Sequence, residues 1–298
     1  MAPIAVGTGK HTYEVVATWL QLPKGITAGH MSGVALDSTG RVHVCHRQEH
    51  SIMVFDSQGT FQTSWGKDAL VDPHLLYISP KNEVYVVDRN GHQVIKFTLD
   101  GKPLLTLGKR EQPSDTGYDQ KEGKVKRPGP PFNRPTDVAV APSGEIYVSD
   151  GYGNCRVHRF SREGRLIQSW GEPGTGKGEF NLPHSIWVDT EGRVIVADRQ
   201  NNRIQIFTSE GQYITDWGDL LRPADIWMDS NKTVYVAELD NRVSILGRDG
   251  KLLARFGGKG DGPGEFNGAH GIWGDPEGNF YVSEVLKGKR VQKFIRKS

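Results

Sequence analysis

The sequence predicts an all-β fold, a six-bladed β-propeller closed by its N-terminal strand. Three observations point to this class: a motif that recurs six times, four short strand patterns in each repeat, and many turn-forming residues. Of the 298 residues, 37 are glycine and 16 are proline. Such a content suits tight turns and disfavours long helices.

Each repeat opens with a short apolar segment. The six openings cover 31–37, 73–79, 135–141, 183–189, 223–229 and 269–275. Their second residues are 32, 74, 136, 184, 224 and 270, so the steps between repeats are 42, 62, 48, 40 and 46 residues. A second strand follows each opening after a Gly or Asn turn, and further strands follow in most repeats. Four strands in about 40–50 residues is the pattern of a propeller blade.

Two segments depart from the regular repeat. The longest step contains a charged, Gly- and Pro-rich insertion at 109–133, which we interpret as a surface loop or lid. The last repeat reaches Ser298 with only three strands, and 13–19 has the pattern of the missing fourth strand. Pairing of this segment with the last repeat would remove an open sheet edge. The sequence therefore predicts one domain that spans 1–298.

Composition excludes several classes of function. The chain has 37 basic and 35 acidic residues, a net charge of +2, so no basic excess indicates binding to nucleic acid or to a membrane. No apolar run is long enough to span a bilayer, and 1–10 lacks the apolar stretch of a secretory signal. The two cysteines, Cys45 and Cys155, favour a reduced, cytoplasmic protein over a disulfide scaffold. The oligomeric state is left open.

Three histidines share the second position of alternate repeats. In order, that position carries Ser32, His74, Thr136, His184, Ala224 and His270. The first strand of each propeller blade runs beside the central channel, so the three imidazoles should converge at one height. Three nitrogen ligands suit a four-coordinate zinc site with one open position, and nickel, cobalt, copper or iron could take the same ligands. The alternative is that each histidine only fills the channel.

The position after the second strand forms another candidate ring. It carries Arg47, Arg89, Tyr152, Arg199, Leu239 and Val285. Arginine forks bind carboxylates through two parallel hydrogen bonds, so Arg47, Arg89 and Arg199 are candidate substrate-binding residues. The residue before this position is acidic in most repeats, and we interpret it as structural because it can hold the turns between blades. For each single arginine, a surface ion pair is the alternative.

Two glycine-rich segments, 171–178 and 257–264, are similar to phosphate-binding loops. No helix pattern follows either segment, and each ends in Glu-Phe-Asn before a new repeat. A phosphate loop opens a helix, so we interpret both segments as turns between blades.

At these residues the sequence resembles the NHL-repeat propellers and, among them, the peptidyl-α-hydroxyglycine α-amidating lyases. The resemblance covers nearly the whole chain. NHL repeats alone also occur in proteins that only bind partners, whereas three His, two Arg and one Tyr at the places of the lyase family are more specific. The resemblance is strongest at 32–37 with 46–47, at 134–140 with 146–152, and at 182–185 with 197–199 and 202–205.

The resemblance implies a role for each candidate residue. His74, His184 and His270 match the zinc ligands of the lyases. Tyr152 matches their proposed catalytic tyrosine. The active-site arginines of the family correspond to Arg47 and Arg199, so these two are candidate catalytic residues as well as substrate ligands. The implied cofactor is Zn²⁺ or another divalent transition metal.

Three departures from the family pattern bear on cofactors and compartment. Gly268 replaces a methionine two residues before the last histidine, and Gly271 replaces a carboxylate that helps to hold calcium in the family. A structural Ca²⁺ is therefore not expected. Ile195 and Ile206 stand where one pair of disulfide cysteines would be, which fits a reduced compartment.

The implied reaction cleaves the C–N bond of a small molecule or peptide that ends in an α-hydroxyglycine unit, and it yields an amide and glyoxylate. Tyr152 would be the base, because metal and arginine charges nearby favour the phenolate. Arg47 or Arg199 would hold the substrate carboxylate, and no redox cofactor is needed. Two alternatives stay open. One is another three-histidine metal lyase or hydrolase on a small hydroxy-acid or amide, with the pocket changed at Gly268 and Arg89. The other is a non-catalytic NHL interaction module.

Overall fold

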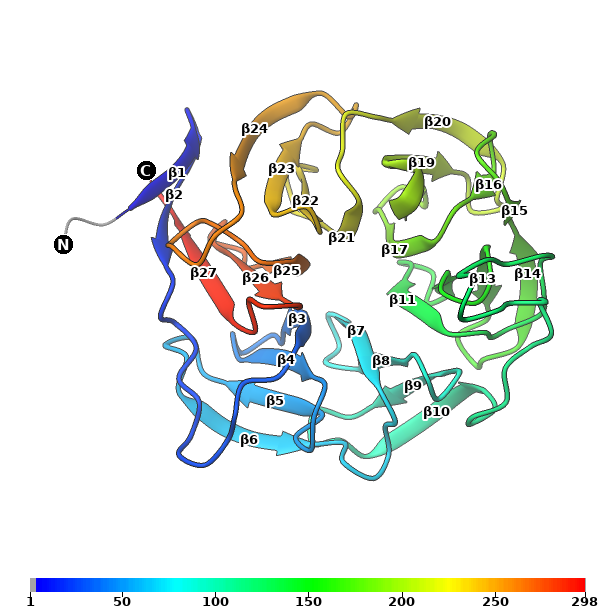
Figure 1. Ribbon diagram of the computed structural model, residues 1–298, viewed down its shortest axis with the longest axis horizontal. Helices are drawn as coiled ribbons and strands as arrows, with labels where there is room; N and C mark the ends of the chain where they lie inside the picture. Colours follow the sequence, from blue (N-terminus) through cyan, green and yellow to red (C-terminus); the bar gives the residue numbers. More distant parts are fainter. Residues whose placement is uncertain (1–3, 298) are drawn as a thin grey trace. The chain divides into compact units, whose positions relative to one another are not determined.

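The part of the chain that the structure describes contains six antiparallel sheets of four or five strands and one short parallel pair, which confirms the predicted all-β, six-bladed propeller class (Figure 1). The computed structural model describes residues 4–297. Within them the helical structure is limited to the 3-10 turn η1 (Arg199–Asn201). No helix of this part of the chain is long and apolar enough to cross a membrane.

The contacts between residues divide the chain into two compact units. The first unit comprises the residues up to 67 and those from 224 onward, and the second unit comprises 68–223. The second unit contains three blades in which sequential strands are neighbours, and a short parallel pair, β15 with β16, precedes the third. Its strands are β7 (Pro73–Ile78), β8 (Val84–Asp88), β9 (Gln93–Phe97), β10 (Pro103–Gly108), β11 (Pro135–Val140), β12 (Ile146–Asp150), β13 (Arg156–Phe160), β14 (Leu166–Trp170), β15 (Glu172–Pro173), β16 (Glu179–Phe180), β17 (Pro183–Val188), β18 (Val194–Asp198), β19 (Arg203–Phe207) and β20 (Tyr213–Trp217).

The first unit contains the other three blades, β3 to β6, β21 to β24, and a five-stranded sheet in the order β1-β2-β27-β26-β25. Its strands are β1 (Ala5–Thr8), β2 (His11–Val16), β3 (Met31–Leu36), β4 (Val42–His46), β5 (Ile52–Phe55), β6 (Phe61–Trp65), β21 (Pro223–Met228), β22 (Val234–Glu238), β23 (Arg242–Leu246), β24 (Leu252–Gly257), β25 (Ala269–Gly274), β26 (Phe280–Glu284) and β27 (Val291–Arg296).

The N-terminal segment completes the last blade, as the sequence predicts. The observed strand β2 pairs with β27 and starts and ends somewhat earlier than the expected 13–19. The sequence analysis did not predict β1, which forms a hairpin with β2 and adds a fifth strand. β1 has only four residues, and none of them is buried, so it carries little hydrophobic pattern.

Burial follows the order of strands within each blade. All five residues of β8 are buried, whereas most of β10 is exposed. Aromatic and branched side chains fill the space between neighbouring sheets, and each such side chain contributes about 1.5–3 kcal/mol when fully buried. The second unit has one cluster that includes Phe132 and one that includes Phe180, and the first unit has a cluster around Trp19.

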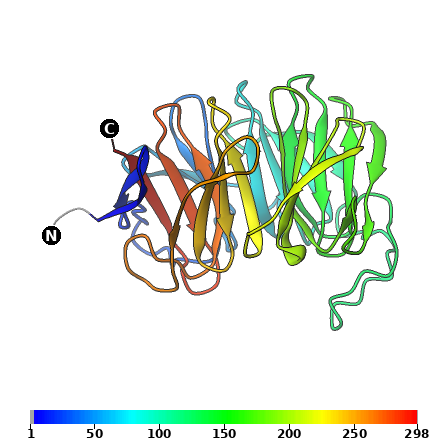
Figure 2. The ribbon, with the colours of Figure 1, turned by 90° about the horizontal axis from the view of Figure 1, so that it is seen from above.

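The insertion at 109–133 is a loop, as expected, and it extends away from the strands of the second unit (Figure 2). Its base is nevertheless fixed. The Thr116 hydroxyl donates to the Gly153 carbonyl oxygen at 2.5 Å, and the Gly129 N–H donates to the Asn154 side-chain oxygen at 3.2 Å. These bonds attach the insertion to the loop that follows β12. The prediction that 1–298 is one domain stays a prediction.

Candidate metal and catalytic site

The second residue of the opening strand lies at a β-bulge in the blades that carry the three histidines. Pro183 pairs with Asp198 and Ser185 with Ala197, so His184 is the extra residue between them. The same shift of register occurs around His74 and His270. A bulge redirects a side chain out of the regular alternation of a strand, and bulges are frequent beside active sites. The repeated bulge therefore gives these positions a common orientation within each blade.

In the second unit, His74 and His184 converge on the hydroxyl of Tyr152. Both histidines have no exposed surface. The Nε2 atoms of His74 and His184 lie 3.2 and 3.1 Å from the Tyr152 hydroxyl oxygen, and the two imidazole centroids are 4.8 Å apart. One hydroxyl proton can be donated to only one of the two nitrogens.

A backbone carbonyl sets the tautomer of His74. Its Nδ1 lies 2.6 Å from the Thr136 carbonyl oxygen, which can only accept, so Nδ1 carries the proton and Nε2 carries the lone pair of the neutral ring. In the first unit, His270 is 2% exposed and its Nδ1 lies 2.6 Å from the Ser32 carbonyl oxygen. Thr136 and Ser32 are themselves second residues of opening strands. The repeat thus gives both histidines the outer-shell hydrogen bond that is typical of metal-ligating imidazoles.

Tyr152 is held by its backbone as well as by its hydroxyl. Its N–H donates to the Arg134 carbonyl oxygen at 3.3 Å. The preceding Gly151 passes so close to β17 that a Cβ there would lie 2.0 Å from the Pro183 carbonyl oxygen. Only glycine fits at that distance. The approach fixes the loop of Tyr152 beside the residue that precedes His184.

Three guanidinium groups surround the Tyr152 ring. The guanidinium carbons of Arg89, Arg199 and Arg134 lie 5.1, 5.3 and 5.8 Å from the ring centroid, which is within the range of cation–π attraction. Sequence reasoning missed Arg134. The available signal was its position directly before an opening strand, where it adopts a left-handed backbone with φ of 58°.

The arginines of the second unit differ in their partners. Arg199 is 7% exposed, and its terminal N–H donates to the Tyr152 hydroxyl at 3.3 Å. Its buried Nε–H has no hydrogen-bond partner among the described residues. Arg89 is already paired with Asp72, with nitrogen–oxygen distances of 2.7 and 2.6 Å. Arg199 is therefore better placed than Arg89 to receive an additional anionic group.

Arg47 belongs to the first unit, where it follows β4, and its backbone N–H donates to the His30 carbonyl oxygen at 3.1 Å. The acidic residues before the other loop positions are structural, as predicted. Asp88, Asp150, Asp198 and Glu284 each accept a backbone N–H from the loop that leads into their blade, at distances of 2.7–3.1 Å. Cys45 and Cys155 are both buried and unbridged.

Comparison with known proteins supports a relation to two named groups. The NHL repeat family matches residues 132–160 and 180–207. Human NHL repeat-containing protein 3 is 31% identical over 258 residues, which cover 80% of this chain and 71% of that protein. Mouse peptidyl-glycine alpha-amidating monooxygenase is 36% identical over 215 residues, or 61% of this chain and 21% of the relative. Drosophila peptidyl-alpha-hydroxyglycine alpha-amidating lyase 1 is 31% identical over 237 residues, or 67% and 41%.

This chain thus spans about a fifth of the length of the monooxygenases that it matches. Among solved structures, a gluconolactonase from Xanthomonas campestris superimposes with a TM-score of 0.72 at 13% identity, over the whole of this chain and 96% of that one. At such identity the likeness shows the fold alone.

Proposed function

The chain belongs to the NHL-repeat family of β-propellers, and on that premise we propose that it is a metal-dependent carbon–nitrogen lyase that cleaves α-hydroxyglycine-type substrates to an amide and glyoxylate. One observation carries the proposal: the hydroxyl of Tyr152 lies within hydrogen-bond distance of two buried imidazoles and a buried guanidinium. The relatives named amidating lyase and amidating monooxygenase support the same chemistry.

The donor set fits a divalent transition metal. His74 presents a lone pair on Nε2 in a site with no exposed surface, and neutral imidazoles are suitable ligands for zinc. We propose that His270 joins His74 and His184, because it occupies the same repeat position and makes the same bond to a backbone carbonyl. A metal bound there supplies Lewis acidity, which lowers the pKa of a nearby hydroxyl.

In the proposed reaction, Arg199 binds the substrate and Tyr152 transfers the proton. The carboxylate of the α-hydroxyglycine unit binds the guanidinium of Arg199, with Arg47 as the second candidate. Tyr152 takes the proton of the substrate hydroxyl. The C–O bond becomes a carbonyl, the C–N bond breaks, and the nitrogen leaves with its electron pair and accepts a proton. The products are a primary amide and glyoxylate. The reaction consumes no oxidant or reductant.

Arg89 and Arg134 act as positioning residues in this proposal. Their guanidinium groups lie over the Tyr152 ring, and the ion pair with Asp72 holds Arg89 in place. Binding of substrate by Arg89 remains a prediction.

The test is release of glyoxylate from a panel of N-acyl-α-hydroxyglycines by protein whose metal content is measured in the same preparation. We expect stoichiometric metal and catalytic release. Metal without glyoxylate release would instead favour another lyase or hydrolase on this scaffold. Absence of metal from protein never exposed to a chelator would favour a non-catalytic NHL interaction module. The human relative is named only for its NHL repeats.

A further inference from the structure

The guanidinium groups around the Tyr152 ring carry more positive charge than their protein partners neutralise. Arg89 is paired with the carboxylate of Asp72. Arg134 and Arg199 form no ion pair with any described residue, and their partners are neutral oxygen atoms and the Tyr152 ring. Like charges held close together repel each other, and a partly buried charge without a counter-ion is costly. Such an arrangement suits an anion as ligand.

Arg134 has N–H groups that the protein does not use. Its Nε–H donates to the Asn90 side-chain oxygen at 3.2 Å, and Nη1–H donates to the Tyr118 hydroxyl oxygen at 3.4 Å. A guanidinium has more N–H donors than these two bonds require. The Nη2 atom of Arg134 has no partner among the described residues and is not buried. The half-buried guanidinium can therefore still bind a carboxylate from solution.

The insertion at 109–133 holds Arg134 in place. Tyr118, which bonds the guanidinium, belongs to the insertion. Asn133, the residue directly before Arg134, donates from its side-chain nitrogen to the Ser114 carbonyl oxygen at 3.0 Å and to the Thr116 hydroxyl oxygen at 3.1 Å. The other blades have no such insertion, so the orientation of this arginine is a feature added to the repeat.

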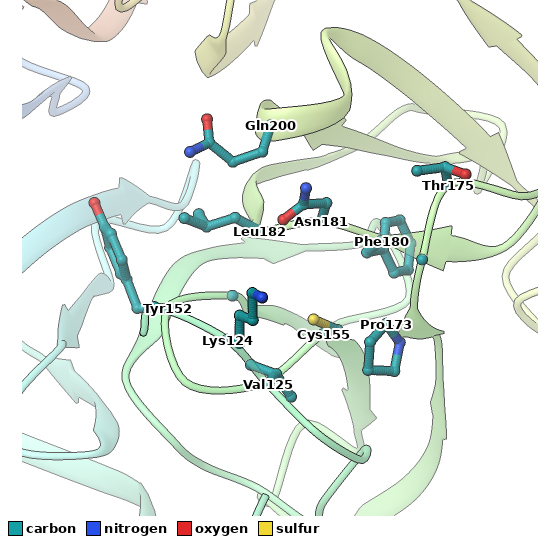
Figure 3. A pocket seen from close by; sticks show the side chains of 13 residues that line it. Lys124, Val125, Tyr152, Cys155, Pro173, Thr175, Phe180, Asn181, Leu182 and Gln200 are labelled. Atoms are coloured by element: carbon teal, nitrogen blue, oxygen red, sulfur yellow. The ribbon is translucent and has the colours of Figure 1, made fainter. Parts of the chain in front are cut away.

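The pocket that borders Tyr152 contains a further cation (Figure 3). Its polar lining includes Lys124 of the insertion, Asn181 and Gln200. The exposed Lys124 ammonium pairs with no carboxylate among the described residues. The surroundings of Tyr152 therefore contain several cations without a carboxylate partner, and the insertion supplies or positions two of them, Lys124 and Arg134.

Arg134 and Arg199 lie close enough to bind two anionic groups of one small substrate. Their guanidinium carbons are 5.8 and 5.3 Å from the same ring centroid, so at most the sum of these distances, about 11 Å, separates them. An extended chain covers about 3.3–3.6 Å per residue. A substrate with one carboxylate on the hydroxyglycine unit and a second acidic group one residue earlier fits within this limit.

We propose that Arg134 binds a second carboxylate of the substrate, on the acyl side of the C–N bond that breaks, while Arg199 holds the carboxylate of the hydroxyglycine unit. The inference rests on the proposed function, and it adds the class of substrate: a molecule with two negative charges. Arg134 is then a specificity-determining residue as well as a positioning one. The same chemistry occurs in an acidic residue before the hydroxyglycine and in a small N-acyl group that ends in a carboxylate.

The test compares acidic substrates with amides of nearly the same shape. One pair is N-acetyl-glutamyl- and N-acetyl-glutaminyl-α-hydroxyglycine, and the other is N-succinyl- and N-succinamoyl-α-hydroxyglycine. We expect kcat/KM to be higher by about tenfold or more for the acid of a pair, because a hydrogen bond between charged partners is the stronger one. A larger ratio in the glutamyl pair assigns the site to peptides, and the reverse assigns it to small dicarboxylates. Equal kcat/KM within both pairs overturns the proposal and leaves the proposed function intact.

Substitution of Arg134 should change the ratio of kcat/KM between acid and amide. Arg134→Gln should bring this ratio close to one, and Arg134→Lys should keep part of it, because an ammonium is charged but lacks the planar fork. Loss of the contact with the Tyr152 ring lowers both members of a pair alike, so a purely positioning role leaves the ratio unchanged. Arg162→Gln is the matched control, because Arg162 is exposed in the turn between β13 and β14. A ratio that persists in Arg134→Gln, or that is lost instead in Lys124→Gln, contradicts the assignment.

Binding of unreactive analogues, measured by calorimetry, separates this proposal from the proposed function. N-acetyl-glutamyl-glycine and N-acetyl-glutaminyl-glycine lack the hydroxyl that the reaction requires, and they differ by one carboxylate. Binding of the glutamyl peptide that is about tenfold tighter, with the difference lost in Arg134→Gln, supports the second carboxylate site even if no glyoxylate is released. Equal affinities, or binding of neither peptide, overturn it, whatever the catalytic result.

Discussion

Two loops of the molecule have the same local structure, yet only one of them lines the pocket that borders Tyr152. One covers 171–182 in the second unit and the other 257–268 in the first. Each contains a short parallel pairing closed by a glutamate, whose carboxylate accepts a glycine N–H three residues earlier. Each is also held from the third strand of its blade by a glutamine that donates at 2.8 Å to the carbonyl of that glutamate, Gln205 to Glu179 and Gln292 to Glu265.

The difference lies in one side chain and in the neighbouring segment. Leu182 lines this pocket together with residues 123–125 of the insertion, whereas Gly268 stands at the equivalent position of the other loop. That other loop packs against the N-terminal hairpin, since a Cβ on Gly264 would lie 2.7 Å from the Val6 side chain. The repeat therefore determines the backbone of both loops, and the segments added to the repeat determine what each loop packs against.

The largest expected effect tests the proposed metal ligands, two from the second unit and one from the first. His184→Ala in the second unit and His270→Ala in the first should both lose the metal and glyoxylate release together, because two neutral ligands hold zinc weakly. Elemental analysis and the glyoxylate assay on matched preparations measure this. His50→Ala is the control, since the Nδ1 of His50 lies 2.8 Å from the hydroxyl oxygen of Ser64 on the outer strand β6. Retention of metal by His270→Ala would remove His270 from the proposed set of ligands.

The next effect concerns Tyr152, for which the blades of the first unit have Arg47, Leu239 and Val285 at the equivalent position. Tyr152→Phe keeps the ring and the cation–π contacts but removes the hydroxyl. We expect kcat to fall by about 10²–10⁴, the usual contribution of a positioned acid or base, with metal content and thermal unfolding unchanged. Tyr213→Phe removes a hydroxyl bonded to Asp216 on the exposed surface and should have no effect. Turnover at the parent rate in Tyr152→Phe would remove the residue from the mechanism.

The sequence predicts those residues of the site that occupy equivalent positions of the repeat. The motif that recurs six times located the blades, and with them the common position of His74, His184 and His270. It also located Arg199 and Tyr152, because both follow a second strand. The bulge that orients the histidines was not predicted, since it depends on the pairing register with the neighbouring strand.

The remaining features lie outside the repeat or depend on backbone conformation. The insertion has no counterpart in other blades, so its approach to Tyr152 could not be inferred from periodicity. Arg134 was missed because it contacts Tyr152 from a left-handed backbone conformation. The sequence does not predict that conformation for an arginine. The short exposed strand β1 was missed because it lacks alternating burial.

A smaller effect separates the two candidate arginines, one from each unit. Arg199→Ala should raise KM if the guanidinium holds the substrate carboxylate alike in ground and transition states, and Arg47→Ala should mainly lower kcat if it stabilises developing charge. Arg199→Lys should restore activity only in part, because an ammonium lacks the planar fork. Steady-state kinetics on the best substrate decides between them. Identical changes in kcat and KM for both alanine variants would show that the arginines act as one group.

The smallest effect exchanges the residues that distinguish the two loops. Leu182→Gly relieves left-handed strain but frees the unfolded chain and removes packing, so the free energy of unfolding should change by no more than about 1 kcal/mol. Gly268→Ala should instead destabilise by about 1–2 kcal/mol, because its φ is 91° and its Cβ would lie 3.1 Å from the Leu286 side chain. Urea unfolding measures both values.

Arg222→Gly is the matched control for the leucine, because Arg222 also precedes an opening strand with a positive φ, 48°, and does not line the pocket beside Tyr152. Both glycine variants relieve a left-handed backbone, but only Leu182→Gly removes a side chain that lines this pocket. A rise of more than about 1 kcal/mol in the free energy of unfolding of Leu182→Gly would contradict this prediction, because the packing of the leucine would then not offset its strain. Equal changes in the two variants would show that the positive φ belongs to the repeat and that the pocket has no part in it.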